Sequence, residues 1–260
     1  MGVLNITSDS FFDGGSFLSM HRACEHAFNL IVQGADIIDI GGESTKPGAI
    51  EVPLDLELSR VIPVIQQIRA NSDICISIDT YKPEVMKAAV HAGANIINDI
   101  YALRKDGALE MARTLNVPVC LMHMQGKPQN MQENPTYPDG VMSDLIHFFS
   151  ERLDACMHAG INRKQLILDP GFGFGKRVKD NLILINKLNE LCQFKLPILL
   201  GVSRKSTIGA VLGKKAAQRL IGSIALAVYA AQKGVSIIRT HDVDETNQAL
   251  QMIEAVNQSE

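Results

Sequence analysis

A short unit that recurs along the chain decides the fold. It reads Gly34-Ala35-Asp36-Ile37-Ile38-Asp39, then Gly93-Ala94-Asn95-Ile96-Ile97-Asn98, and then Gly234-Val235-Ser236-Ile237-Ile238-Arg239. In each copy a predicted helix ends at a glycine, which tolerates the left-handed backbone of a helix C-cap, and an apolar strand follows directly. Helices that lead straight into buried strands are typical of chains that build a parallel sheet.

The same alternation extends over the whole chain. Apolar runs predict eight strands, at residues 2–4, 37–40, 74–78, 96–97, 119–122, 166–168, 198–200 and 236–238. Helical patterns lie near residues 20–33, 55–70, 83–92, 107–115, 140–158, 181–191, 215–233 and 243–256. Eight such units predict an α/β fold, a single (β/α)8 barrel of the TIM type. An open doubly wound sheet is the alternative, but no glycine-rich nucleotide-binding motif follows the first strand.

Length and composition restrict the class of protein. The 260 residues, 46% of them hydrophobic, suit one domain over residues 1–260. A formal net charge of −3 argues against a nucleic-acid partner, and no apolar stretch is long enough to predict a membrane span. Five separated cysteines without a C-x-x-C pair, together with no signal peptide, predict a cytoplasmic protein.

Polar or ionisable residues follow every predicted strand. They are Asn5, Glu43 to Lys46, Asp79, Asn98 with Asp99, His123, Asp169, Ser203 to Ser206, and Arg239 with His241. Because the strands are parallel, all of these residues meet at the C-terminal rim of the barrel, where the catalytic residues of such barrels lie. A lone polar residue after a strand is often only a helix N-cap, and we assign that role to Asp99, Asp242 and Ser143.

Part of this rim is suited to a diphosphate. Arg239 and His241 are two residues apart on an extended segment, so both side chains point the same way, and the loops after strands seven and eight often bind phosphate. Lys46 could reach the same anion. Asn5 supplies a neutral oxygen that could bind Mg²⁺, which commonly takes further ligands from substrate phosphates.

Another part is suited to a flat heterocycle. Asp79 and Asp169 come from opposite sides of the barrel, with Asn98 between them, and carboxylates in a partly dry pocket need donors from a ligand. The guanidine-like edge of a pterin would supply such donors, and Lys205 could bind the acceptor side of the ring. The alternative is a structural ion pair between one of these aspartates and Lys205 or Arg204.

The quoted motifs resemble those of the dihydropteroate synthases. The likeness begins with Met1-Gly2-Val3-Leu4-Asn5-Ile6-Thr7, Asp9-Ser10-Phe11 and Asp13-Gly14-Gly15, and continues in order along nearly the whole chain. It includes residues 42–49, 77–80, 97–99, 123–126, the glycine-rich turn at 169–176, residues 201–206 and residues 239–243. The chain is therefore identified as similar to enzymes that join a pterin diphosphate to para-aminobenzoate and release pyrophosphate.

The resemblance implies roles for the matching positions. Asp79, Lys205 and Asn5 would be catalytic, and Mg²⁺ would bind at Asn5. The pterin would contact Asp79, Asn98, Asp169, Lys205, Met122 and Phe174, and the diphosphate would contact Asn5, Lys46, Arg239 and His241. Para-aminobenzoate, or a competing sulfonamide, would contact Phe11, Thr45, Pro47, Lys205 and Ser206. Family members are typically homodimers, with residues 216–231 a candidate contact surface.

The chain departs from the family pattern at three places. Ser8 replaces the usual proline in the first loop, which loosens a predicted lid without removing a chemical group. Lys46 replaces the usual arginine, so a single charge stands in place of a bidentate donor. The chain also starts almost inside the first strand, without the short segment that usually precedes it, and we expect this to affect stability more than activity.

Two other functions fit parts of the pattern. A pterin-dependent methyltransferase barrel would share the pterin carboxylates but would have no use for Arg239-Thr240-His241 or Ser203-Arg204-Lys205-Ser206. A non-catalytic paralogue that binds pterin without turnover would tolerate the departures at Ser8 and Lys46. Pyrophosphate release that depends on para-aminobenzoate distinguishes the synthase from both.

Overall fold

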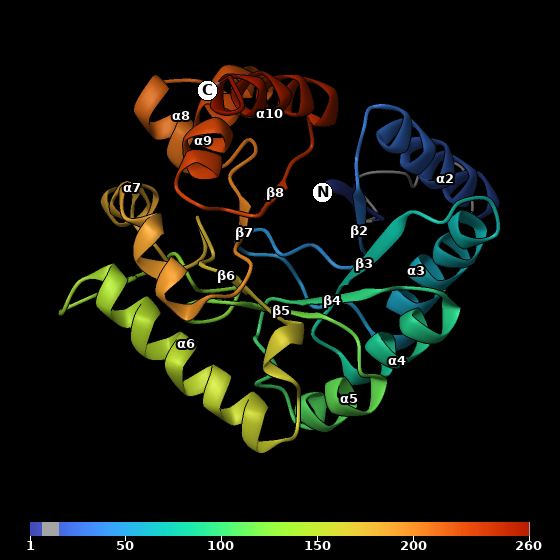
Figure 1. The fold of residues 1–260 in the computed structure, drawn as a ribbon. Helices are drawn as coiled ribbons and strands as arrows, with labels where there is room; N and C mark the ends of the chain where they lie inside the picture. The colour runs from blue at the N-terminus through green and yellow to red at the C-terminus, as the bar shows by residue number, and fades with distance from the viewer. Residues whose placement is uncertain (7–15, 260) are drawn as a thin grey trace.

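Eight parallel strands form a closed barrel at the centre of the molecule (Figure 1). The computed structural model describes residues 1–6 and 16–259. The strands are β1 Gly2–Asn5, β2 Ile37–Gly41, β3 Cys75–Asp79, β4 Ile96–Asp99, β5 Val119–Met122, β6 Leu166–Asp169, β7 Leu199–Gly201 and β8 Ile237–Arg239. β1 to β6 pair in sequence order and β7 pairs with β8. Parallel bridges between Gly2 and Thr240 and between Leu168 and Ile198 join the two groups, so the predicted (β/α)8 barrel is confirmed.

The helices surround the barrel (Figure 1). They are α2 Ser16–Val32, α3 Leu54–Arg69, α4 Pro83–Ala92, α5 Ala108–Leu115, α6 Val141–His158, α7 Val178–Asn186, α8 Ser206–Leu212, α9 Leu220–Gln232 and α10 Val243–Asn257. Three 3₁₀ segments, Arg163–Gln165, Leu188–Phe194 and Ala216–Gln218, complete the connections. No helix in the described part of the chain has the length and apolar character needed to cross a bilayer.

The core has two parts because successive strand residues point to opposite faces. In β4, for example, Ile97 belongs to the large cluster between strands and helices, whereas Ile96 packs inside the barrel with Cys120 and Leu199. The inward positions at the N-terminal ends of the strands are therefore apolar. This layer closes the floor of the barrel, and the polar inward positions lie above it, in the middle of the strands and at their C-terminal ends.

Three helix predictions differ from the structure. The helix predicted at 181–191 is α7, which ends at Asn186, and the chain continues as a 3₁₀ segment. The helix predicted at 215–233 begins at Leu220, after a separate 3₁₀ turn. The short helix α8 was not predicted because its seven residues include Gly209 and β-branched residues, which give no helical signal.

Candidate active site

The inward positions at the C-terminal ends of the strands form one ring of side chains. The strand register aligns Asn5 with Gly41, Gly41 with Asp79, and Asp79 with Asn98. Gly41 leaves the space between Asn5 and Asp79 open, since a Cβ there would lie 3.7 Å from Asn5 Oδ1 and 3.6 Å from Asp79 Oδ2. The ring continues with further residues of the same orientation, namely Met122, Asp169, Gly201 and Arg239.

Arg239 lies between two buried carboxylates. Its Nε donates to Asp39 Oδ2 at 2.6 Å and one Nη donates to Asp79 Oδ2 at 2.9 Å. Asp39 is fully buried and also accepts hydrogen bonds from the Asn98 amide at 3.2 and 3.3 Å. Sequence analysis did not single out Asp39. The available signal was a lone acid at an inward-facing position of an otherwise apolar strand.

Burial and neighbouring charges set the ionisation of this ring. The pKa of Asp79 is raised to about 7, mainly by burial and then by the negative charge of Asp39, while Arg239 opposes the shift. Burial lowers the pKa of Lys205 to about 8, and the nearby Arg239 acts in the same direction. Burial disfavours the charge of Arg239, but the carboxylates of Asp39 and Asp79 outweigh it and raise its pKa. Asp79 can therefore change protonation state near neutral pH.

Asp169 is the member of the ring at the end of β6, and Lys205 lies beside it in the loop after β7. Asp169 Oδ1 accepts a hydrogen bond from Gly171 N at 2.7 Å, and burial raises the pKa of its carboxyl. Lys205 Nζ lies 4.0 Å from the centroid of the Phe174 ring, a distance that allows a cation–π contact. Phe174 and Met122 belong to one apolar cluster together with Tyr81, Ile100, Tyr101, Met124 and Met131.

His241 and the loop after β2 lie further out. His241 Nδ1 is 3.0 Å from Ser203 Oγ, and burial together with Arg239 lowers the pKa of the imidazole, which favours its neutral form. Lys46, Pro47 and Ser206 are exposed, and Thr45 is partly buried. Within the described residues, no hydrogen bond or ion pair joins Lys46 to Arg239 or His241. Phe11 falls outside the residues that the structure describes.

The loop after β2 is held at its base by a buried ion cluster. Lys82 Nζ lies 2.6 Å from Glu43 Oε2, 2.5 Å from Glu57 Oε2 and 2.7 Å from Val52 O. Further along the loop, Gly48 N donates to Pro128 O at 3.1 Å. The loop therefore extends from β2 toward the loop after β5, across the rim.

Two of the three predicted N-caps, Asp99 and Ser143, are wrong, and the third, Asp242, has the N-cap position without a side-chain hydrogen bond to the helix. Asp99 faces away from the ring and accepts hydrogen bonds from Tyr101 N and Leu103 N, so its carboxylate closes a turn that precedes α5. Asp242 occupies the N-cap position of α10, but its carboxylate pairs with Arg204 instead of the helix. Ser143 lies inside α6, whose N-cap is Gly140. The ion pair of Arg204 is therefore with Asp242, not with Asp79 or Asp169.

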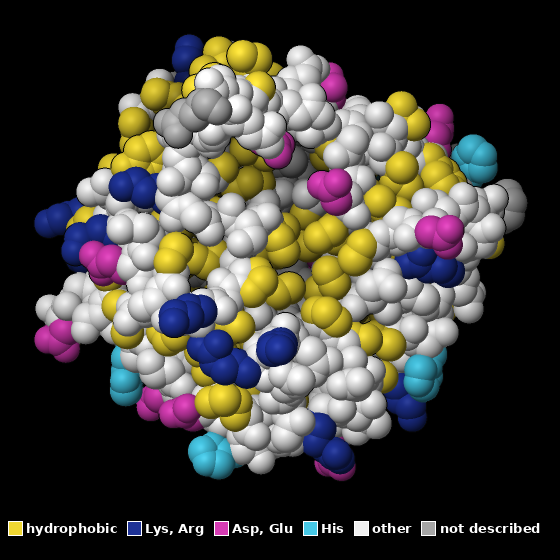
Figure 2. Space-filling view, viewed as in Figure 1, with side chains coloured by type: hydrophobic (Ala, Val, Ile, Leu, Met, Phe, Trp, Pro, Cys, Tyr) yellow, Lys and Arg dark blue, Asp and Glu magenta, His cyan; other side chains and the backbone are white. Residues whose placement is uncertain are grey.

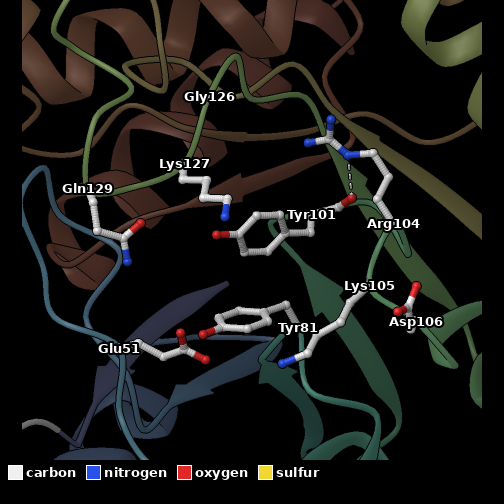
Figure 3. A pocket seen from close by; sticks show the side chains of 9 residues that line it. All are labelled: Glu51, Tyr81, Tyr101, Arg104, Lys105, Asp106, Gly126, Lys127 and Gln129. Carbon is white, nitrogen blue, oxygen red and sulfur yellow. Dashed lines mark hydrogen bonds between the residues drawn. The ribbon is translucent and has the colours of Figure 1, made fainter.

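A cavity of about 760 Å³ opens beside the ring (Figure 3). The loops after β2, β3, β4 and β5 form its walls, and Tyr81 and Tyr101 project into it. These tyrosines also belong to the apolar cluster of Met122, so the cavity adjoins the ring without including Asp79 or Lys205 among its described lining residues. Among the residues described, no group of three or more His, Cys, Asp or Glu is arranged to hold a metal ion.

Comparison with known proteins agrees with this arrangement. The family model described as pterin binding enzyme matches residues 1–241. A dihydropteroate synthase of Escherichia coli (strain K12) is 51% identical over 98% of this chain and 90% of its own length.

Solved structures give the same result. The Yersinia pestis dihydropteroate synthase in a sulfonamide drug complex is 49% identical with a TM-score of 0.95, and the match covers 100% of this chain and 94% of that one. The Xanthomonas albilineans dihydropteroate synthase in complex with 7,8-dihydropteroate is 44% identical with a TM-score of 0.91, at 100% and 94% coverage. The chain therefore belongs to the pterin-binding enzymes and, among them, to the dihydropteroate synthase family.

Proposed function

We propose that the inward-facing ring condenses 6-hydroxymethyl-7,8-dihydropterin diphosphate with para-aminobenzoate, giving 7,8-dihydropteroate and pyrophosphate. The observation that carries the assignment is the meeting of Asp79, Asn98, Asp169, Lys205 and Arg239 at one mouth of the barrel. This set combines buried acceptors with buried cations. Dihydropteroate synthases are transferases of folate biosynthesis, and the mouth offers a pterin and a diphosphate the partners that each requires.

The pterin fits the deeper half of the mouth. Its N–H edge would donate to Asp169, Asp79 and the Asn98 amide oxygen, since buried carboxylates without ligand donors are costly. Lys205 would donate to an acceptor of the ring. The ring faces would pack on Met122 and Phe174, which already share an apolar cluster. Burial of the acids favours a ligand with several N–H groups, and the pterin edge provides them.

The diphosphate fits the outer half. Arg239, His241 and Lys46 would donate to its oxygens, and Asn5 would contact both the diphosphate and Mg²⁺. Arg239 already pairs with the carboxylates of Asp39 and Asp79, so its charge is not fully available to the anion. An added cation is therefore needed, and one amide oxygen with substrate phosphates is a donor set that suits Mg²⁺. When bound, Mg²⁺ would neutralise charge that develops on departing pyrophosphate.

The reaction needs no enzyme nucleophile. The bond between the pterin methylene carbon and the diphosphate oxygen breaks, pyrophosphate takes the electron pair, and positive charge remains on the methylene. Ionised Asp79 stabilises this charge across the conjugated ring. The amine of para-aminobenzoate then forms the new C–N bond and loses a proton to solvent. Phe11, Thr45, Pro47, Lys205 and Ser206 would shape the para-aminobenzoate site, where sulfonamides compete.

Pyrophosphate release tests the assignment. The expected result is release that requires pterin diphosphate, para-aminobenzoate and Mg²⁺ together, and that stops when EDTA is added. Pterin binding without release would instead support a non-catalytic paralogue. Methyl transfer from a methylated pterin would support the methyltransferase, which has no use for Arg239 and His241 as phosphate ligands.

We also propose that the enzyme is a homodimer of the cytoplasm. Large apolar side chains are exposed on α8 and α9, including Val211, Leu212 and Ile221, the last with 81% of its surface exposed. Figure 2 shows hydrophobic side chains over the region of these two helices. Exposed apolar patches of this kind support a protein interface. All five cysteines are free thiols, a state that a reducing compartment maintains.

A further inference from the structure

Lys176 ends the glycine-rich turn, and its ammonium group is buried. The residue is 3% exposed, and its Nζ donates to Gly171 O at 3.0 Å and to Phe174 O at 3.1 Å. The same atom lies 2.9 Å from His123 Nδ1. A fourth and longer contact joins Nζ to His123 O at 3.4 Å. An ammonium group has three hydrogens, so the three shorter contacts are enough to use all of its donors.

The position of the ammonium group determines the tautomer of His123. Burial lowers the pKa of Lys176 to about 7. In its ammonium form Lys176 can only donate, so Nδ1 of His123 accepts and Nε2 carries the hydrogen. Nε2 then donates to Asp144 Oδ2 at 2.9 Å. Burial and the charge of Lys176 lower the pKa of His123 to about 4, which agrees with a neutral ring. A chain of hydrogen bonds thus leads from half-exposed Asp144 on α6 to the turn after β6.

The turn itself fits closely against the loop after β5. A Cβ at Gly171 would lie 1.9 Å from His123 O, and one at Gly175 would lie 2.5 Å from Gln125 O. Both glycines also have positive φ, 65° and 59°. Only glycine allows both the close approach and the positive φ. These two glycines therefore let the turn adopt the conformation in which the carbonyls of Gly171 and Phe174 point toward Lys176.

The same turn positions two groups of the mouth. Gly171 N donates to Asp169 Oδ1, which fixes the carboxylate, and Phe174 carries the ring beneath Lys205 Nζ. Lys176 donates to the carbonyls of both Gly171 and Phe174, and among the described residues it forms no hydrogen bond or ion pair with Asp169 or Lys205. Its hydrogen bonds therefore reach the mouth through the turn, and its charge also acts on Asp169, whose pKa it lowers.

We propose that Lys176 is a positioning residue for the pterin pocket: through Gly171 and Phe174 it sets Asp169 and the Phe174 ring, and His123 with Asp144 keeps its ammonium group in place. The inference rests on the proposed assignment of the pterin site. It predicts a larger effect on pterin binding than on para-aminobenzoate binding. Of the proposed para-aminobenzoate residues, Thr45 and Pro47 lie on the loop after β2, which a different buried lysine holds, while Lys205 is the member that contacts Phe174.

The test compares Lys176→Met with Lys179→Met. Methionine keeps the length of the side chain but removes the donors, and Lys179 is an exposed lysine of α7 only three residues away. Calorimetric titration gives the Kd of a non-reactive pterin analogue. Steady-state rates give the KM for para-aminobenzoate at saturating pterin diphosphate. Urea unfolding identifies the conditions in which each variant is folded. We expect Lys176→Met to weaken pterin binding by about tenfold or more, since small displacements of binding groups are costly. KM for para-aminobenzoate should stay within about twofold, and Lys179→Met should match the wild type in all measurements.

A purely structural role would give a different pattern. Folded Lys176→Met with wild-type pterin Kd, even if its unfolding midpoint is lower, would overturn the proposal. If this variant does not fold, His123→Asn and Asp144→Asn decide, because they alter the support of the ammonium group and leave Lys176 in place. Wild-type pterin Kd in both would overturn the proposal, and a weaker Kd in either would support it. Failure of the wild-type protein to bind the analogue would instead contradict the proposed function.

Discussion

The pairing of Asp39 with Arg239 leads to a prediction about pH dependence. In the proposed reaction Asp79 must be ionised to stabilise positive charge on the pterin methylene, and its pKa is raised to about 7 by burial and by Asp39. Activity should therefore fall as the pH drops below about 7. Asp39→Asn keeps the shape of the side chain and an acceptor for Asn98 but removes the negative charge. Without that charge the pKa of Asp79 decreases, so the acidic limb of the pH profile moves to lower pH.

The size of the shift follows from the geometry. The two carboxylates contact the same guanidinium, at 2.6 and 2.9 Å. Two unit charges roughly 6 Å apart interact by about 3 kcal/mol at an effective dielectric constant of about 20. One pKa unit corresponds to about 1.4 kcal/mol, so the upper limit of the shift is about 2 units. Water and ions at the mouth reduce the interaction, and we expect a shift of about 1 to 2 pH units.

The assay is pyrophosphate release between about pH 5 and 9, analysed as kcat/KM for pterin diphosphate, which reports groups of the free enzyme. Ser77→Ala is the matched control, because Ser77 pairs with Asp39 in the strand register and is buried at the same depth. Its hydroxyl has no hydrogen-bond partner within the part of the chain that the structure describes, and its removal changes no charge. The control also accounts for titration of the substrate. An acidic limb of Asp39→Asn that coincides with the limb of Ser77→Ala would refute the reasoning.

Three further predictions concern single positions. Asp79→Asn should retain the urea unfolding midpoint but lower kcat by about 100-fold or more, because the neutral amide cannot stabilise the cation; an unchanged steady-state rate would remove Asp79 from the mechanism. Lys46→Arg should lower KM for pterin diphosphate by about threefold, since a bidentate donor replaces a single charge, and equal KM values would show that Lys46 does not contact the anion. Ile221→Lys should shift the protein from dimer to monomer in sedimentation velocity, whereas Val32→Lys, an equally exposed change on α2, should not; an unaltered dimer would exclude this surface.

The fold was predictable because its signal is local and repeated. Each strand is a short apolar run after a helix, and the predicted strands agree with the structure to within a residue or two at each end. Polar residues just after these runs, such as Asn5, Asp79 and Asp169, could be assigned to one rim because parallel strands share one direction. The boundary between α7 and the 3₁₀ segment that follows could not be predicted, because the buried Leu188 and Leu191 continue the apolar spacing that the sequence pattern assigns to a helix.

The site was predictable only where a residue ends a strand. Asp39 lies two residues before the end of β2 and therefore deeper in the barrel than the ring. The residues around it are isoleucines, and its position in the chain gives no sign of a partner. Its partner Arg239 is 200 residues away and comes close only when the barrel closes between β8 and β1.

The partners of Lys176 could not be predicted from the sequence either. In the sequence it is the cation at the end of a glycine-rich turn, and a cation beside glycines is usually assigned to an anionic ligand. In the structure its donors all bind within the protein, to two carbonyls of the turn and to His123. A buried charge needs a partner, so sequence alone can require that one exists. Which residue it is depends on the register of the barrel and the packing of its loops. The strand-end charges that we propose bind the substrates are therefore recognisable as motifs, whereas the charges that hold them in place can be identified only from the closed structure.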